Sequence, residues 1–170
     1  MIRKAEIDTL PRCQKIFEHP LYKKHFGNLQ KLEADRIFCR HTFEHFMDVA
    51  RIAYIMNLEK GLGISREIIY ATALLHDIGR DEQYENGTPH DKASADISRC
   101  ILPECGFNDD EIDLIIVAIM SHRGSGKLSD KMTLSEIIYI ADKASRQCFM
   151  CKAQDECNWS MDKRNLEINI

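Results

Sequence analysis

The sequence contains no apolar run of the ~18 to 20 residues that a helix needs to cross a bilayer. Its first residues, MIRKAEIDTLPRCQ, also have no apolar segment of the kind found in a secretory signal peptide. We therefore expect a cytoplasmic protein with no membrane partner. The chain has no internal repeat, linker or low-complexity tract, and 170 residues with 44% hydrophobic content suit one core. We expect a single domain over residues 1–170.

Positive charge is not in excess either, because the formal net charge is −4 at pH 7. A chain of this charge is a poor candidate for a dedicated nucleic-acid-binding module, although it could hold a local basic pocket. The seven cysteines are an odd number without a secretory signal, so we expect thiols or metal ligands and no disulfide framework.

The C-terminal cysteines have a spacing that raises the question of a further metal. Cys148, Cys151 and Cys157 follow a C-x₂-C-x₅-C pattern, which is compatible with a zinc or iron–sulfur site. Three thiolates are one short of the usual four ligands, unless Cys39, Cys13 or an exogenous group supplies the last. Reduced thiols that bind no metal are the alternative.

The segments between the sequence breaks carry helical patterns, and these predict an all-α fold. We expect helices from near residue 40, from 88 to about 102, from 109 to 121 and from 134 to 147. Thr88 and Pro89 predict an N-cap and a first helical residue, and Thr133 with Glu136 predicts a capping box. The segments EIIYATALL and IDLIIVAIM are apolar nearly all round, as expected of helices at the centre of such a fold.

Four histidines and two aspartates lie in or beside apolar sequence on five of the expected helices. They are His45, His76, Asp77, His90, His122 and Asp142. Any one of these histidines alone is more often a hydrogen-bonded core residue than a ligand. A small core cannot easily satisfy all six by mutual hydrogen bonds, whereas one or two metal ions would neutralise the acids and use the imidazole lone pairs. This donor set suits Fe, Mn, Zn, Co or Ni.

The ordered set of these residues resembles the H…HD…H…H…D signature of the HD-domain superfamily. The segments HFMDVARIA, ALLHDIGR and IADKASR are similar to the segments that characterise this family, and the resemblance covers about residues 40–146. The N-terminal helices expected over 1–39 and the cysteine-containing tail 147–170 are not covered. The resemblance implies a single-domain helical bundle of HD type and metal-dependent phosphohydrolase activity on a small phosphorylated substrate, such as a nucleotide.

The six-ligand pattern is similar to the binuclear branch of that family, which includes diadenosine tetraphosphate hydrolases. The resemblance implies one metal held by His45, His76, Asp77 and Asp142. It implies a second metal held by His90 and His122, with Asp77 bridging the two. Two metals on a bridging carboxylate would generate a metal-bound hydroxide at neutral pH and clamp the phosphoryl oxygens.

Two arginines follow proposed ligands at helical spacing. Arg80 lies three residues after Asp77, and Arg146 lies four residues after Asp142, so both are candidates to hold phosphate oxygens. For each of them a solvated charge, or an ion pair with a surface acid, is the alternative. We expect the catalytic residues to be Asp77, Arg80 and Arg146.

Lys143 and Arg123 are weaker candidates for phosphate contacts, and His41, four residues before His45, could either reach the pocket or cap its helix. Two other functions stay open. An HD-fold di-iron oxygenase would share the ligand order, and a nucleotide sensor would share the fold without catalysis. The complete ligand set disfavours the sensor. The sequence leaves the oligomeric state and the identity of the substrate open.

Overall fold

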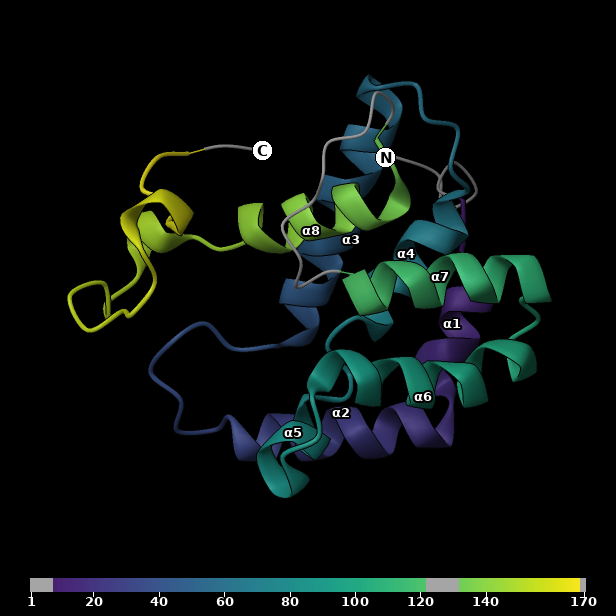
Figure 1. The fold of residues 1–170 in the computed structure, drawn as a ribbon, viewed down its shortest axis with the longest axis horizontal. Coiled ribbons are helices and arrows are strands. Elements are labelled where there is room, and N and C mark those ends of the chain that lie inside the picture. Colours follow the sequence, from purple (N-terminus) through teal and green to yellow (C-terminus); the bar gives the residue numbers. More distant parts are fainter. Residues whose placement is uncertain (1–7, 122–131, 169–170) are drawn as a thin grey trace, which may run out of the picture.

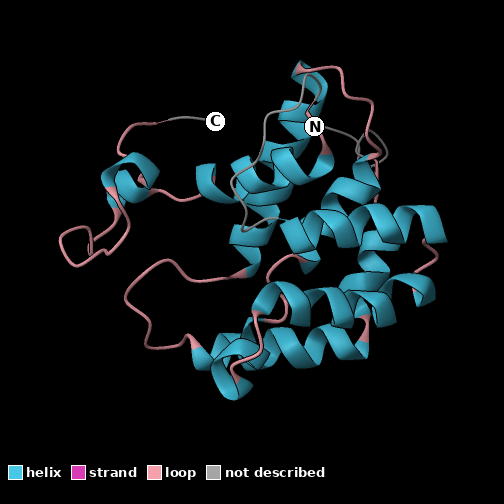
Figure 2. Ribbon diagram, in the orientation of Figure 1, coloured by secondary structure: helices cyan, strands magenta, loops and turns pink. Residues whose placement is uncertain are grey.

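The computed structural model describes residues 8–121 and 132–168, and within them the chain is helical, with no strand (Figure 2). The helices, in order, are α1 (Pro11–Glu18), α2 (Pro20–Leu32), α3 (Phe43–Glu59), α4 (Arg66–Leu75), α5 (Arg80–Asn86), α6 (His90–Glu104), α7 (Asp109–Ser121) and α8 (Leu134–Ala144), with the short 3₁₀ helices η2 (Cys148–Met150) and η3 (Met161–Lys163). The expected all-α class is confirmed.

Helix α4 lies at the centre of the bundle and packs against α1, α3, α6, α7 and α8 (Figure 1). Its apolar side chains are buried, and the buried hydroxyl of Thr72 donates a 2.7 Å hydrogen bond to the Ile68 carbonyl. The expectation for α7 is wrong in part, because Leu114, Val117 and Met120 are exposed. Helix α7 contacts only its neighbours α4, α6 and α8 strongly, so one of its faces is not covered by another described helix.

Helix ends follow some of the sequence signals and not others. The capping box of Thr133 and Glu136 is present at the start of α8. Thr88 does not cap α6, which begins at His90 without a side-chain cap. Instead the Gln83 side chain accepts a 3.1 Å hydrogen bond from the His90 backbone N–H, and this satisfies a group that a cap would otherwise bind.

Two helices also end away from their expected positions. Helix α6 continues through Pro103 to Glu104, beyond the expected end near 102. Helix α8 ends at Ala144, short of the expected 147, and the Asn165 side chain donates hydrogen bonds to the carbonyls of Lys143 and Ala144 at this end. The C-terminal segment therefore supplies partners for carbonyls that the end of the last long helix leaves without an intrahelical bond.

The turn between α4 and α5 depends on one glycine. Gly79 donates a 2.9 Å hydrogen bond from its backbone N–H to Ser94 Oγ. A Cβ at this position would lie 2.4 Å from the backbone nitrogen of Ser94 and 2.7 Å from Ala93. Only glycine allows this approach, and the approach holds the start of α6 beside the residues that follow α4.

The loop over residues 33–42 and the C-terminal segment over 145–168 lie on the same side of the bundle, at the left of Figure 1. Both segments extend from the ends of long helices, α2 for the loop and α8 for the C-terminal segment. Among the helices described, none combines the length and the apolar character that crossing a bilayer requires.

Candidate metal centre

Four side chains from three parts of the fold converge at the centre of the bundle. They are His45 on α3, His76 and Asp77 in the turn after α4, and Asp142 on α8. Each offers a ligand atom, and these atoms all lie within 4.8 Å of one another. His45 Nε2 is 3.4 Å from Asp142 Oδ1, and His76 Nε2 is 3.2 Å from Asp77 Oδ2. We call these residues the four-residue group.

His90 approaches the same carboxylate from the other side. Its Nε2 lies 3.2 Å from Oδ1 of Asp77, whereas His76 faces Oδ2. The two oxygens of Asp77 therefore face imidazoles from different elements, the start of α6 and the end of α4. His122, the remaining histidine of the expected set, lies outside the described residues, as does Arg123.

The histidine rings are held with Nε2 directed at the carboxylates. Each Nδ1–H donates to a protein oxygen: His76 to the Ala73 carbonyl (2.7 Å), His90 to Gln83 Oε1 (2.6 Å), and His45 to Ser145 Oγ (3.1 Å). In the neutral form of each ring, these hydrogen bonds fix the tautomer in which Nε2 carries the lone pair, which is the form that binds metals.

Cations accompany the buried carboxylates. Arg80 Nε lies 2.8 Å from Asp77 Oδ1, and Arg146 Nη2 lies 3.0 Å from Asp142 Oδ1. Lys143 also forms an ion pair with Asp142. An unpaired carboxylate in this position would cost several kcal/mol, and these ion pairs reduce that cost.

The same contacts shift the pKa values of the group. Burial alone would raise the pKa of Asp142, but the nearby His45 and His76 rings and the charge of Arg146 lower it well below its usual range. Burial would lower the pKa of His76, yet the nearby carboxylates raise it to about 9. In the metal-free chain His76 therefore holds a proton that a metal would replace, because ligands bind metals in their deprotonated form.

His41 is hydrogen-bonded to the buried Glu33, which also binds the hydroxyl of the exposed Tyr84, and sequence analysis identified neither residue. Its Nδ1–H donates to Glu33 Oε1 at 2.7 Å, and its backbone N–H donates to Glu33 Oε2 at 2.7 Å. The Tyr84 hydroxyl also donates to Glu33 Oε1 at 2.7 Å. Burial would raise the pKa of Glu33, but the hydrogen bonds from His41 and Tyr84 lower it to about 2. His41 does not cap α3, because Thr42 does.

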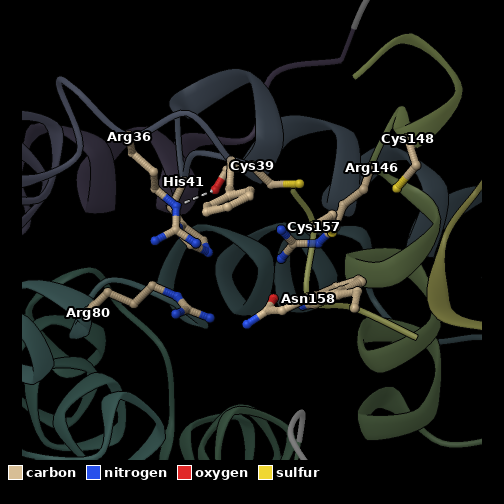
Figure 3. Close-up of a pocket in the computed structure, with 10 residues that line it drawn as sticks. Arg36, Cys39, His41, Arg80, Arg146, Cys148, Cys157 and Asn158 are labelled. Atoms are coloured by element: carbon tan, nitrogen blue, oxygen red, sulfur yellow. Dashed lines mark hydrogen bonds between the residues drawn. The ribbon is translucent and has the colours of Figure 1, made fainter. Parts of the chain in front are cut away.

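Two adjoining cavities open beside the centre, and both are lined by cations. The first, of about 340 Å³, is lined by residues that include Arg36, His41, Arg80, Arg146 and Trp159. In Figure 3 the three arginines extend from different parts of the chain toward the middle of this cavity. The second, of about 530 Å³, shares Arg80, Arg146 and Trp159 with the first and adds His90, Asp142, Lys143 and Lys163.

The cysteine prediction is not supported. The described residues form two groups of three or more His, Cys, Asp or Glu side chains with converging ligand atoms, and neither group contains a cysteine. Cys148 and Cys157 line the first cavity, whereas Cys151 lies on a neighbouring one, and all three are free thiols. The spacing C-x₂-C-x₅-C therefore does not bring these three thiols to one point.

The second group consists of His25, Asp81 and Glu82, which sequence analysis also missed. His25 Nδ1 lies 2.8 Å from Asp81 Oδ2, and the Glu82 backbone N–H donates to Asp81 Oδ1 at 2.9 Å. Both oxygens of this aspartate thus have partners within the protein. The group joins α2 to α5, the helix whose first residue is Arg80.

The donor set of the four-residue group fits a divalent transition metal. Neutral imidazole and carboxylate are the ligands that Fe, Mn, Zn, Co and Ni bind in proteins. His45 Nε2 is buried and makes no hydrogen bond within the described residues, and a metal would use its lone pair. The residues present are therefore able to hold a metal.

Comparison with known proteins identifies the family. A protein from Clostridium beijerinckii (strain ATCC 51743 / NCIMB 8052), described only as uncharacterized, is 50% identical over 139 residues, or 82% of this chain and 86% of the relative. The crystal structure of a predicted HD superfamily hydrolase from an uncultured Thermotogales bacterium matches with a TM-score of 0.59 and 20% identity, over 89% of this chain and 86% of that one. Residues 42–147 match the HD domain model, and the chain therefore belongs to the HD domain family.

Proposed function

We propose that this protein is a metal-dependent phosphohydrolase that acts on a nucleotide or another small phosphorylated compound. One observation carries the proposal: the two cation-lined cavities share Arg80 and Arg146, and each of these arginines also contacts a carboxylate of the four-residue group. A cavity lined by arginines favours phosphate, which guanidinium groups bind in bidentate geometry. The solved relative from the Thermotogales bacterium is itself described as a predicted hydrolase.

Each part of the site has a role in this proposal. A divalent metal bound by the four-residue group would supply Lewis acidity and lower the pKa of a bound water. Arg80 and Arg146 would bind the phosphoryl oxygens, on which negative charge accumulates. Trp159, whose ring centroid lies 4.9 Å from the Arg146 guanidinium carbon, would hold that guanidinium in place and cover the site from solvent.

We also propose two metal ions, with Asp77 as their shared ligand. Support comes from the two oxygens of Asp77, of which Oδ2 faces His76 and Oδ1 faces His90. His122 would complete the second set. This arrangement is the one that the resemblance to the binuclear branch and its diadenosine tetraphosphate hydrolases implies.

The test is phosphate release under anaerobic conditions from a panel of nucleotides, sugar phosphates and model phosphodiesters. We expect hydrolysis of at least one class by protein loaded with Mn²⁺, Fe²⁺ or Co²⁺, and none by the Asp77→Ala variant. If the protein converts a substrate only when O₂ is admitted, it is the di-iron oxygenase instead. Binding of a nucleotide without turnover by any metal-loaded form would identify the sensor and overturn the proposal.

A further inference from the structure

We propose that His41 is an additional ligand of the metal centre, and that its Nε2 binds an ion to which Asp77 also binds. His41 is not part of the His and Asp pattern discussed above. It also lies one residue before the segment that matches the HD domain model, which begins at residue 42. The proposal depends on the presence of a metal centre and does not depend on the reaction that the centre performs.

The ring of His41 is held in the same way as the rings of the three expected histidine ligands that the structure describes. Its Nδ1–H donates to a protein oxygen, Glu33 Oε1, just as His45, His76 and His90 donate theirs. This bond places the lone pair on Nε2. In all four residues, Nε2 then faces a carboxylate of the centre.

Within the part of the chain that the structure describes, the Nε2 atom of His41 has no hydrogen-bond partner. It is buried and makes no hydrogen bond within the described residues, and the whole residue is 1% exposed. A buried polar atom in this state costs about 1 to 3 kcal/mol, unless a ligand absent from the protein itself completes it. His41 Nε2 is therefore directed at a position that none of the described residues fills.

The distances identify that position. His41 Nε2 lies 3.5 Å from Asp77 Oδ2, and His76 Nε2 lies 3.2 Å from the same oxygen. Two atoms that each bind one ion at about 2.1 Å, with an angle of roughly 90 to 115° between them, lie about 3.0 to 3.5 Å apart. His41 Nε2 thus lies next to Oδ2 of Asp77, in the same way that His90 Nε2 lies next to Oδ1.

The contacts of Glu33 also support a role for His41 as a metal ligand. Its buried carboxylate accepts two hydrogen bonds from this one histidine. Glu33 is 2% exposed and receives hydrogen bonds from the His41 ring, the His41 backbone and Tyr84. Histidines that bind metals commonly donate their other ring N–H to a carboxylate, which fixes the ring and makes it a stronger ligand. The loop over 33–42 therefore contributes a ligand and the group that orients it.

The experiment measures binding of Co²⁺ alone to metal-free, full-length protein, by competition with a chelator and by visible absorption. The proteins are wild type, His41→Ala, Glu33→Gln and the control His19→Ala, which removes a histidine at the junction of α1 and α2. We expect His41→Ala to weaken binding of one ion at least about tenfold and to alter the Co²⁺ spectrum. We expect Glu33→Gln to weaken binding with a similar spectrum, and His19→Ala to match wild type.

Unchanged affinity together with an unchanged spectrum in His41→Ala would overturn the proposal. If circular dichroism shows that this variant does not fold, ¹⁵N NMR of wild type decides the matter. The Nε2 resonance of His41 must then shift when Zn²⁺ is added, and a resonance that stays in place overturns the proposal equally. No substrate is used in these measurements, so a failed phosphohydrolase assay leaves their outcome unaffected.

Discussion

Arg146 Nη2 lies 3.0 Å from Oδ1 of Asp142, and Asp142 precedes Arg146 by four residues in the chain. The same arginine lines both cavities and lies against the ring of Trp159. One guanidinium thus contacts a carboxylate of the proposed metal centre and the space that a substrate would occupy. This position links the arginine to phosphate binding more directly than to metal binding.

Replacement of Arg146 by Ala should lower kcat/KM and leave the metal content unchanged. A lost charge-assisted hydrogen bond to phosphate corresponds to about 1.5 to 3 kcal/mol, or roughly a ten- to hundredfold decrease in kcat/KM. Arg146→Lys should recover part of the loss, because it retains the charge without the bidentate geometry. Steady-state kinetics and elemental analysis on the same samples check this. If Arg146→Ala and Arg80→Ala both turn over at the wild-type rate, neither arginine binds the substrate.

Trp159 should report ligand binding by its fluorescence. It is the only tryptophan in the chain, and Lys143 Nζ lies 5.9 Å from its ring centroid, on the side of the second cavity. An anion that binds there should move the cations around the indole and change its emission. We expect adenosine 5′-monophosphate to change the emission of wild type, and a weaker response in Arg146→Ala. Calorimetry that detects binding without any change in emission would place the ligand elsewhere.

Acid should destabilise the metal-free protein partly through Glu33. Its pKa in the folded state is about 2, below the value of about 4.3 typical of an unfolded chain. A lowered pKa contributes stability that is present above pH ~4.5 and is lost as the pH falls toward 2. Urea unfolding at pH 6, 4.5 and 3 should therefore show a smaller loss in Glu33→Gln than in wild type, by about 1 to 2 kcal/mol. Parallel losses in the two proteins would show that Glu33 does not contribute in this way.

A chelator should lower the melting temperature by several degrees. The four-residue group joins α3, the turn after α4 and α8, so a bound metal would stabilise the folded state relative to the unfolded chain. Differential scanning fluorimetry of metal-loaded protein, with and without chelator, measures the difference. An unchanged melting temperature in the presence of the chelator would show that metal binding does not stabilise the fold.

Local signals predicted much of this arrangement. The capping box at Thr133 marks the start of α8, and the end of the apolar run before His76 marks the end of α4. The cluster of His41, Glu33 and Tyr84 could not be predicted, because Tyr84 and Glu33 are 51 residues apart and no periodic pattern links them. Contacts across such distances depend on how the helices pack, which a single sequence does not encode in any local signal.

The sequence also did not predict which residues surround the site. The C-terminal segment has few apolar residues, yet it supplies Trp159 and Asn158 to both cavities. The exposed face of α7 has the same composition as a buried one, so Leu114 and Val117 gave no sign of their exposure. The single-domain organisation and the cytoplasmic location expected from the sequence stay predictions.

Elemental analysis of wild type and Asp77→Ala, both purified without added metal and then loaded with Mn²⁺, tests the central claim most directly. Asp77 faces His76 with one oxygen and His90 with the other. We expect about two transition-metal ions per chain in wild type, and loss of both in Asp77→Ala, because each ion would lose a shared ligand. Asp96→Ala, which removes an exposed aspartate of α6, should bind as wild type does. Full retention of metal by Asp77→Ala would contradict the account.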